Sequence, residues 1–297
     1  MDKSCILPPT QDIAIFTLFE KRRSLNWMKT IIVCSLNDRA GTNIRERLLE
    51  NYSFKEAEFY FDENPVYCLG PELVLVSSVQ DIVNVDNLSQ QFQDCKFIFI
   101  SRHVAESGIP SLTAHLAGNF GPAVFGGEPG EIANYSPSLL KNYLIELNSF
   151  RSDLDPAYNL TLEATHHGPT SLNSPVIFVE LGSTEIQWID LKASAVISHA
   201  IVRTIRSNRS FSKIAIGIGG THYPEKLNRL EFNSDYALGP IIPKYALEHF
   251  SQELLEQILE KSDQKIETAL VDAKGLGKFK ENVFETLKDS GLEKVLI

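Results

Sequence analysis

Short runs of apolar residues alternate with segments of helical periodicity along this chain, and this alternation restricts its fold more than any other feature. The apolar runs lie at residues 30–35, 72–78, 97–101, 176–181, 214–218 and 269–273. Between them, apolar residues recur at helical spacing over residues 140–147, 193–207, 250–259 and 279–287. Continuous apolar strands that alternate with helices are typical of a buried parallel sheet. We therefore predict an α/β fold with a mostly parallel sheet and helices on both faces.

Length and composition limit what such a fold can bind. At 297 residues and 43% apolar content, the chain can bury a substantial core. Its 38 acidic residues against 28 basic ones argue against non-specific binding to nucleic acid or to an anionic membrane, although a local basic patch stays open. The four cysteines include no CxxC pair, which favours reduced thiols. No apolar run approaches the roughly 18 residues that span a bilayer, so we expect a cytoplasmic protein without a membrane partner.

Residues 1–27 differ from the rest of the chain. They contain a short apolar stretch, but basic residues follow this stretch, whereas a secretory signal places them before it. Met28 opens "MKTIIVCSLNDRAGTNI", which has the form of a protein's own beginning, with a strand, a turn and a helix. We therefore expect residues 1–27 to be an extension or an untranslated upstream segment, and residues 28–297 to form the functional domain.

Histidines follow several of the predicted strands. In sheets of this kind, ligands bind beyond the carboxyl ends of the strands, and such ends carry His103, His166, His167 and His222. His115 lies within a Gly- and Pro-rich segment, residues 105–138, that we interpret as a long functional loop. Neutral imidazole is a common zinc ligand, and its pKa suits proton transfer near neutrality. A single such histidine is usually structural, but the group together indicates a site.

The adjacent pair His166 and His167 follows a predicted strand at residues 158–164. Neighbouring side chains of a strand point to opposite faces, so both rings can face one ion only where the strand has ended. Gly168 and Pro169 come next, and we expect one histidine of the pair to enter the site and the other to support it. Glu163 lies three residues before His166 and can act as a ligand, a general base or an orienting partner.

Two further segments suit a phosphate or an oxyanion. The turn "GIGGTHY" contains Gly219 and Gly220, whose amides can bind either group, with a simple tight turn as the alternative. The segment 203–213 is basic, and its arginines can contact nucleic-acid phosphates or complement the end of the preceding helix. These arginines are Arg203, Arg206 and Arg209.

Lys274 and Lys278 form a second, weaker basic candidate. The sequence contains no Walker A lysine, no GxSxG elbow and no HExxH, so kinase, serine esterase and zincin functions have no motif support.

Seven segments, taken together and in this order, resemble a known family. They are "MKTIIVCSLNDRAGTNI", "FIFISRH", "SLTAHLAGNFG", "LEATHHGPT", "VELGSTEIQW", "GIGGTHY" and "IIPKYAL". They are similar to the archaeal and plant type of D-aminoacyl-tRNA deacylase, from Met28 to about Leu292. The resemblance implies a zinc-dependent hydrolase that releases D-amino acids from tRNA, with a fold similar to bacterial peptidyl-tRNA hydrolase. Residues 28–297 would then be the deacylase domain.

The histidine motifs of the family map onto this chain, and the chemistry of ester hydrolysis suggests a role for each candidate residue. His166 or His167, together with Glu163, would activate the attacking water, directly or through zinc. The amides of Gly219 and Gly220 would bind the oxyanion. The expected metal ligands are His103, His115, His166 and His222. Arg203, Arg206 and Arg209 would bind the tRNA, and no DNA partner is expected.

One position departs from the family pattern. Where Gly-His-Ile is expected, this chain has Gly239, Pro240 and Ile241. Proline can neither ligate a metal nor transfer a proton, so the number of metal ions stays open. Two alternatives to the deacylase also stay open: a zinc-dependent hydrolase of a small amide or ester, and a non-catalytic RNA-binding protein.

Overall fold

The computed structural model describes residues 29–297, except residues 86 and 208. The expectation that residues 1–27 are an extension or untranslated concerns a segment outside the described residues. Within the described part, no helix is both long enough and apolar enough to cross a membrane.

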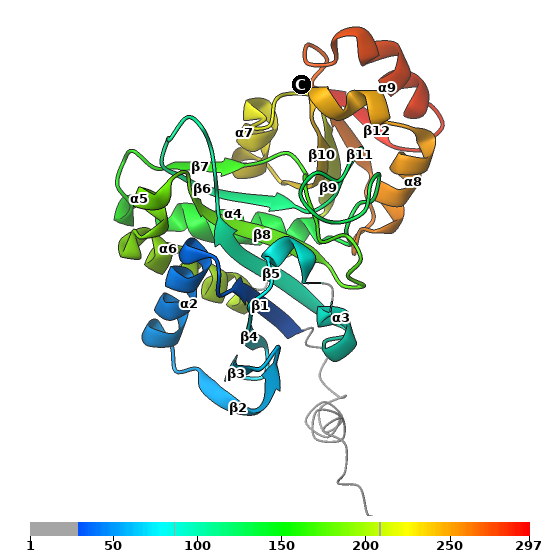
Figure 1. Cartoon of the computed structure of the whole chain (residues 1–297). Coiled ribbons are helices and arrows are strands. Elements are labelled where there is room, and N and C mark those ends of the chain that lie inside the picture. The colour runs from blue at the N-terminus through cyan, green and yellow to red at the C-terminus, as the bar shows by residue number, and fades with distance from the viewer. Residues whose placement is uncertain (1–28, 86, 208) are drawn as a thin grey trace, which may run out of the picture.

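Two β-sheets form the framework (Figure 1). The strands of the larger sheet are β1 (Lys29–Ser35), β2 (Lys55–Phe61), β3 (Asn64–Leu69), β4 (Leu73–Ser78), β5 (Cys95–Arg102), β6 (Ser111–Leu116), β7 (Asn159–Leu162) and β8 (Val176–Gly182). Those of the smaller sheet are β9 (Lys213–Ile218), β10 (Tyr236–Ile242), β11 (Thr268–Val271) and β12 (Glu293–Leu296). The larger sheet has the order β2-β3-β4-β1-β5-β8-β6-β7, and the smaller has the order β10-β9-β11-β12.

Most neighbouring strands are parallel, as predicted. In the larger sheet, β1 pairs in parallel with β4 and β5, and β5 pairs in parallel with β8. The β2-β3-β4 edge is antiparallel, and β6 runs antiparallel to β8. The smaller sheet is parallel throughout. Each apolar run singled out in the sequence coincides with a strand, which confirms a mostly parallel α/β fold.

The segment 105–138, interpreted as a loop, contains a buried strand, β6. This correction moves His115 from a loop into the sheet. The strand was missed because polar side chains occupy one of its faces, where they belong to the site described below. Strand β10 was also missed, because Pro240 argues against a strand; the register shifts between Leu238 and Ile241 accommodate it.

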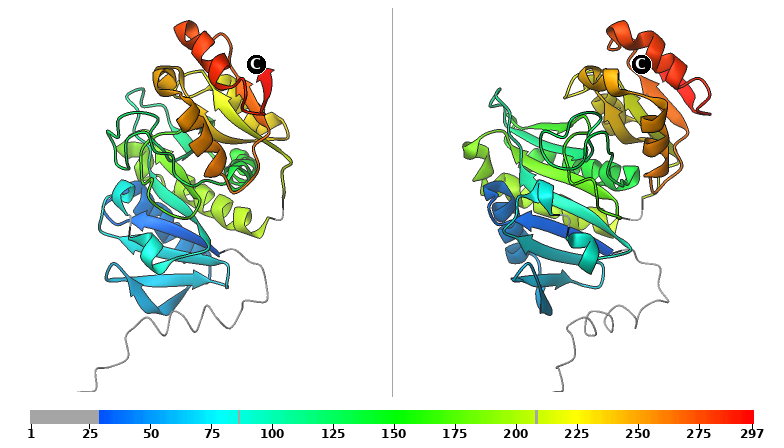
Figure 2. Two further views of the ribbon diagram at one scale, coloured as in Figure 1. Left: turned by 90° about the vertical axis from the view of Figure 1, so that its right-hand side faces the viewer. Right: turned by 45° about the vertical axis from the view of Figure 1, so that its right-hand side comes forward.

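Helices cover the sheets and join them. The helices are α2 (Arg39–Asn51), α3 (Leu88–Gln91), α4 (Pro137–Ser149), α5 (Glu185–Trp188), α6 (Leu191–Arg206), α7 (Glu225–Asn233), α8 (Gln252–Glu260) and α9 (Lys280–Thr286). Short 3₁₀ turns occupy Ile82–Asn84, Arg151–Asp153, Lys244–His249 and Gly277–Phe279. Helices α2 and α6 pack on one face of the larger sheet, while α3 and loop residues cover the other. Helix α4 contacts β6 and β10, so it links the two sheets (Figure 2).

A buried lysine fastens α4 to the smaller sheet. The side chain of Lys141 donates hydrogen bonds to the carbonyl oxygens of Glu231 and Ser234, at the end of α7. Glu231 is itself fully buried and accepts a hydrogen bond of 3.0 Å from the Leu238 amide in β10. Burial raises the pKa of Glu231 to about 8. The Lys141 ammonium therefore satisfies carbonyl groups at the joint between α4, α7 and β10.

We expect Lys141→Met to lower the free energy of unfolding by about 3 kcal/mol, because it leaves the carbonyl oxygens of Glu231 and Ser234 without this donor. Urea denaturation followed by circular dichroism measures this change. Lys192→Met, at an exposed position of α6, is the matched control and should change stability little. A decrease for Lys141→Met no larger than for this control would contradict the role of Lys141 at the joint.

Candidate active site

One face of the larger sheet changes from apolar to polar near the carboxyl ends of β5 and β8. Side chains alternate along a strand, so Ser101 follows Phe99 on this face of β5. In β8, Glu180 follows Phe178 on the same face. The register pairs Phe99 with Phe178 and Ser101 with Glu180. His115 of β6 lies beside Phe178, with the two rings stacked at 5.1 Å. The apolar core therefore ends at a buried carboxylate.

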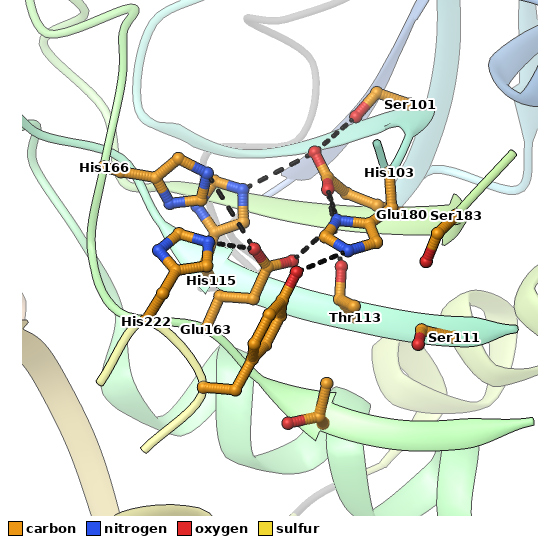
Figure 3. Close-up of polar contacts among 12 residues, drawn as sticks. Ser101, His103, Ser111, Thr113, His115, Glu163, His166, Glu180, Ser183 and His222 are labelled. Atoms are coloured by element: carbon orange, nitrogen blue, oxygen red, sulfur yellow. Dashed lines mark hydrogen bonds and ion pairs between the residues drawn. The ribbon is translucent and has the colours of Figure 1, made fainter. Parts of the chain in front are cut away.

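Two buried carboxylates, Glu163 and Glu180, flank His103 (Figure 3). The Nδ1 of His103 lies 3.2 Å from Glu163 Oε1 and 3.2 Å from Glu180 Oε2. Its Nε2 lies 2.9 Å from the hydroxyl of Tyr223. Glu180 also accepts a hydrogen bond of 2.9 Å from Ser101 Oγ. Both ring nitrogens of His103 therefore have partners, which leaves no free lone pair for a metal.

The charges of this group follow from its contacts. Burial by itself lowers the pKa of His103, but hydrogen bonds to the two carboxylates outweigh burial and raise this pKa to about 10. Burial also opposes ionisation of Glu163 and Glu180, yet hydrogen bonds with neighbouring imidazoles hold the pKa of both carboxyls below the usual range. A carboxylate with so low a pKa is a weak base. Glu163 is therefore suited to orienting an imidazole and stabilising positive charge.

His166 and His167 both face His115. Strand β7 ends at Leu162, and His167 adopts the left-handed conformation with a φ of 45°, so the alternation of a strand no longer separates the pair. The ring of His115 lies 4.0 Å from that of His166 and 4.8 Å from that of His167. Both histidines of the pair thus enter the site, whereas we expect from the sequence that only one does.

The protonation of these three rings makes them suitable metal ligands. Their Nδ1 atoms lie 3.1, 2.8 and 2.7 Å from the carbonyl oxygens of Leu116, Ala164 and Gly168. A carbonyl only accepts, so each Nδ1 carries a proton, and each Nε2 has a lone pair when its ring is neutral. Ligand atoms of the three rings lie within 4.8 Å of one another. The Nε2 of His115 is buried and makes no well-aligned hydrogen bond, although Glu180 Oε1 lies 3.5 Å away. Burial by itself lowers the pKa of His115, but Glu180 outweighs burial and raises it, so a metal here would displace a proton from this ring. We call this group the histidine trio.

Burial keeps two members of the histidine trio neutral. It lowers the pKa of His166 well below the usual value and that of His167 to about 4. Neutral imidazoles whose Nδ1 donates to a carbonyl are the arrangement found around protein-bound zinc. Two other groups also bring ligand atoms within 4.8 Å: Glu163, His166 and His222, and His103, Glu163 and Glu180. In both groups Glu163 is already paired with an imidazole, 2.7 Å from His222 and 3.2 Å from His103, so the histidine trio fits a metal best.

His222 and Glu163 form a second functional unit. Glu163 follows β7 and His222 follows β9, so the two sheets meet at this contact (Figure 3). The Nε2 of His222 lies 2.7 Å from Glu163 Oε2, which fixes the proton on Nε2. Nδ1 is then the acceptor, and it lies 3.2 Å from the Tyr245 hydroxyl. A buried carboxylate thus orients a partly exposed imidazole, as in the histidine and acid pair of many hydrolases.

A pocket of about 770 Å³ adjoins His222. Its lining includes Gly220 and Tyr245. Gly219 lies behind this pocket, and its amide donates a hydrogen bond of 2.8 Å to the carbonyl of Ile242. The Gly219 amide is therefore not available to an oxyanion, contrary to the expectation from the sequence.

The predicted tRNA-binding arginines do not lie at this site. Helix α6 begins after the carboxyl end of β8, where Glu180 lies, and extends for 16 residues toward the amino ends of the strands. Its last turn, which carries Arg203 and Arg206, therefore lies away from the site. Arg203 Nε lies 2.8 Å from a carboxylate oxygen of Glu146, and Arg209 pairs with the same carboxylate. A contact of Arg203, Arg206 or Arg209 with tRNA stays a prediction.

Pro240 is buried in β10, and the next amide, that of Ile241, donates to Thr165 Oγ1 at 3.1 Å.

Glu180, Tyr223 and Tyr245 belong to the site but were not predicted from the sequence. The sequence contains a feature that could have indicated Glu180 and one that could have indicated Tyr223. Glu180 is the single charged residue of the apolar run 176–181, and a carboxylate in a buried strand requires partners. Tyr223 follows His222 in the turn "GIGGTHY".

Comparisons with known proteins agree on one family. Residues 91–295 match the family model described as D-aminoacyl-tRNA deacylase. The chain is 35% identical over 274 residues to the D-aminoacyl-tRNA deacylase of Thermococcus kodakarensis, covering 90% of this chain and 98% of that protein. It is also 35% identical over 276 residues to the protein of the same name from Pyrococcus horikoshii, with the same coverage.

A solved structure shares the fold. The crystal structure of AF0625, described as a conserved protein of unknown function, matches with a TM-score of 0.83 and 31% sequence identity. The match covers 91% of this chain and 95% of that one.

The charged group around His103 predicts a pH dependence of stability. The folded pKa of about 10 lies above the ordinary value of 6.5, so the folded state binds the proton more tightly. The stabilisation from His103 should be complete below pH 6.5 and should be lost as the pH rises to about 10. His103→Gln removes this titration. Urea denaturation across this range should therefore show the stability difference between wild type and variant shrinking as pH rises; a constant difference would contradict the assignment.

Proposed function

The chain belongs to the D-aminoacyl-tRNA deacylase family, and we propose that it hydrolyses the ester bond of D-aminoacyl-tRNA to release free D-amino acid and tRNA. The observation that carries this proposal is the pairing of His222 with buried Glu163, next to the histidine trio and the open pocket. Ester hydrolysis needs a base for the water, a donor for the oxyanion and room for the substrate. The site supports each of these requirements. Such a reaction would keep D-residues out of translation and recycle the tRNA, and a cytoplasmic location stays a prediction.

His222 is the residue best placed to take a proton from the attacking water. Its Nδ1 is the acceptor nitrogen and faces the pocket side, where the Tyr245 hydroxyl now occupies the hydrogen-bonding position. Glu163 holds the tautomer through Nε2 and stabilises the imidazolium that forms. This assignment refines the expectation from the sequence, in which His166 or His167 takes this role with Glu163.

Tyr223 is suited to stabilise the oxyanion. Protonated His103 donates from Nε2 to the Tyr223 oxygen, so the phenol proton is free to point toward the substrate. Burial and the nearby carboxylates raise the pKa of Tyr223, which keeps the phenol protonated and able to donate. The contacts of His103 Nδ1 with the carboxylates of Glu163 and Glu180, which accept its proton in hydrogen bonding, then hold this donor in place. Tyr223 would thus take over the role predicted from the sequence for the Gly219 amide, while the part predicted for the Gly220 amide stays a prediction.

Zinc fits the histidine trio, and we propose His115, His166 and His167 as its ligands. A bound zinc ion would lower the pKa of a water molecule and polarise the ester carbonyl. The buried Nε2 of His115, without a well-aligned hydrogen bond, supports this proposal. His222 would belong to the proton-transfer unit and His103 to the charged group beside it.

The deacylase proposal is tested by the release of amino acid from D-tyrosyl-tRNA and L-tyrosyl-tRNA, measured side by side. We expect fast release from the D-ester alone. Glu163→Gln should lower kcat by about 10²- to 10⁴-fold, because it weakens the orientation of the base. Glu248→Gln, at an exposed position outside the site, is the control. Equal cleavage of both esters, or cleavage only of small amino-acid esters, would favour a small-molecule hydrolase; no cleavage would favour a non-catalytic RNA-binding protein.

Zinc binding is measured on the purified protein by metal analysis and by competition with a chelator. We expect about one tightly bound ion per chain at a three-histidine site. His167→Ala should weaken binding by about tenfold or more, because it removes a ligand. His249→Ala removes a partly exposed imidazole that the histidine trio does not include, so it should bind zinc as wild type does. Equally weakened binding in both variants, or binding that is unchanged in His167→Ala, would exclude the proposed ligand set.

A further inference from the structure

The pocket beside His222 lies at the carboxyl ends of three parallel strands. Gly220 follows β9, Lys244 follows β10 and Asp272 follows β11, and all three residues line the pocket. Crevices at these ends are where α/β sheets bind their ligands. At about 770 Å³, the pocket is within the range of small-molecule sites.

The pocket has positive charge that the protein does not neutralise. Among residues 29–297 that the structure describes, neither Lys244 nor Lys274 has an acidic partner within 4.0 Å. Asp272 also lines the pocket, but its Oδ1 accepts a hydrogen bond of 2.8 Å from Lys226. Two unpaired lysines at one cavity are notable in a chain with a formal net charge of -10. They indicate an anionic ligand, for which a phosphate is the natural choice.

Aromatic side chains and glycine residues form much of the rest of the pocket wall. Tyr245 is 58% exposed, and Phe279 lines the pocket as well. Exposed aromatic rings beside lysines are the common means of binding an unpaired base, which stacks on the ring. At Gly275, a Cβ atom would lie 2.7 Å from the Gly220 amide nitrogen, so only glycine leaves this part of the wall open.

The position of His222 limits which part of a substrate the pocket can hold. His222 lines the pocket and is also hydrogen-bonded to Glu163, so a ligand there lies next to the reacting ester. In aminoacyl-tRNA, the group attached to that ester is the ribose of the terminal adenosine. We propose that this pocket binds the 3′-terminal nucleoside of tRNA, with the base against Phe279 and Tyr245 and the phosphate on Lys244 and Lys274. This inference rests on the proposed function.

The proposal separates two basic regions of the chain. Arg203 and Arg209 share Glu146 at the far end of α6, whereas Lys244 and Lys274 stand unpaired beside the reacting group. The two lysines would therefore bind the CCA end, which all aminoacyl-tRNAs have in common.

The direct test is binding of the trinucleotide CpCpA, with no amino acid attached, by isothermal titration calorimetry. Lys244→Ala and Lys274→Ala should each weaken binding by about tenfold. Each should also reduce the slope of log K against log salt by about 0.7 for every phosphate that the variant no longer binds. Phe279→Ala should weaken binding by about fivefold or more, because the base can no longer stack on the ring. Lys265→Ala, which removes an exposed charge outside the pocket, in the segment between α8 and β11, is the matched control. Because the lysines are exposed, the lysine variants should fold as wild type does.

A kinetic arm uses the same variants with D-tyrosyl-tRNA and with D-tyrosine methyl ester, which lacks a nucleotide. KM for the tRNA should rise about tenfold in the lysine variants and stay at the wild-type value in Lys265→Ala, and KM for the methyl ester should rise much less than KM for the tRNA. The proposal is overturned if wild type does not bind CpCpA, or if Lys265→Ala weakens binding as much as the pocket variants. CpCpA binding that depends on the lysines, without cleavage of any aminoacyl-tRNA, would retain the pocket and refute the proposed deacylase.

Discussion

The site depends on the burial of two carboxylates that stay ionised. Glu163 and Glu180 lie at the end of an apolar sheet face, where an isolated negative charge would be strongly unfavourable. Imidazoles on every side offset this cost. His103 bridges the two carboxylates, and His222 binds Glu163. His103 contacts both carboxylates, so its removal would deprive each of a partner and destabilise the whole group. The same constraint assigns protons: His103 is charged, whereas burial keeps His166 neutral.

The two sheets are joined where the chemistry takes place. The amide of Ala164 donates a hydrogen bond of 2.8 Å to the carbonyl of His222, and the amide of Thr165 donates one of 3.2 Å to the carbonyl of Ile241. Backbone bonds of this kind fix the end of β7 against the ends of β9 and β10. They set the distance between Glu163 and His222 more firmly than the side chains could. The pocket beyond His222 belongs to the smaller sheet, while the histidine trio belongs to the larger, so a substrate would span the joint.

Much of the fold could be predicted from the sequence, because buried parallel strands are continuous apolar runs and need no context to be recognised. Strands β6 and β10 could not be predicted in this way, because β6 carries polar side chains of the site and β10 contains Pro240. The histidines at strand ends were found for the same reason that ligands bind there. The separate roles of these histidines could not be predicted, because each role depends on which carbonyl or carboxylate oxygen lies next to each ring nitrogen. Glu180 shows the limit: its position in a strand was visible, but its partners on neighbouring strands were not.

The separation of the catalytic unit along the chain has a consequence for biosynthesis. Glu163 emerges from the ribosome well before His222, and the lining residue Phe279 comes later still. A partly synthesised chain can therefore form much of the larger sheet while it still lacks its base and its pocket. Esterase activity would arise only when the smaller sheet has docked. During refolding, the return of activity should then report this docking step, and spectroscopic signals from the larger sheet should recover earlier.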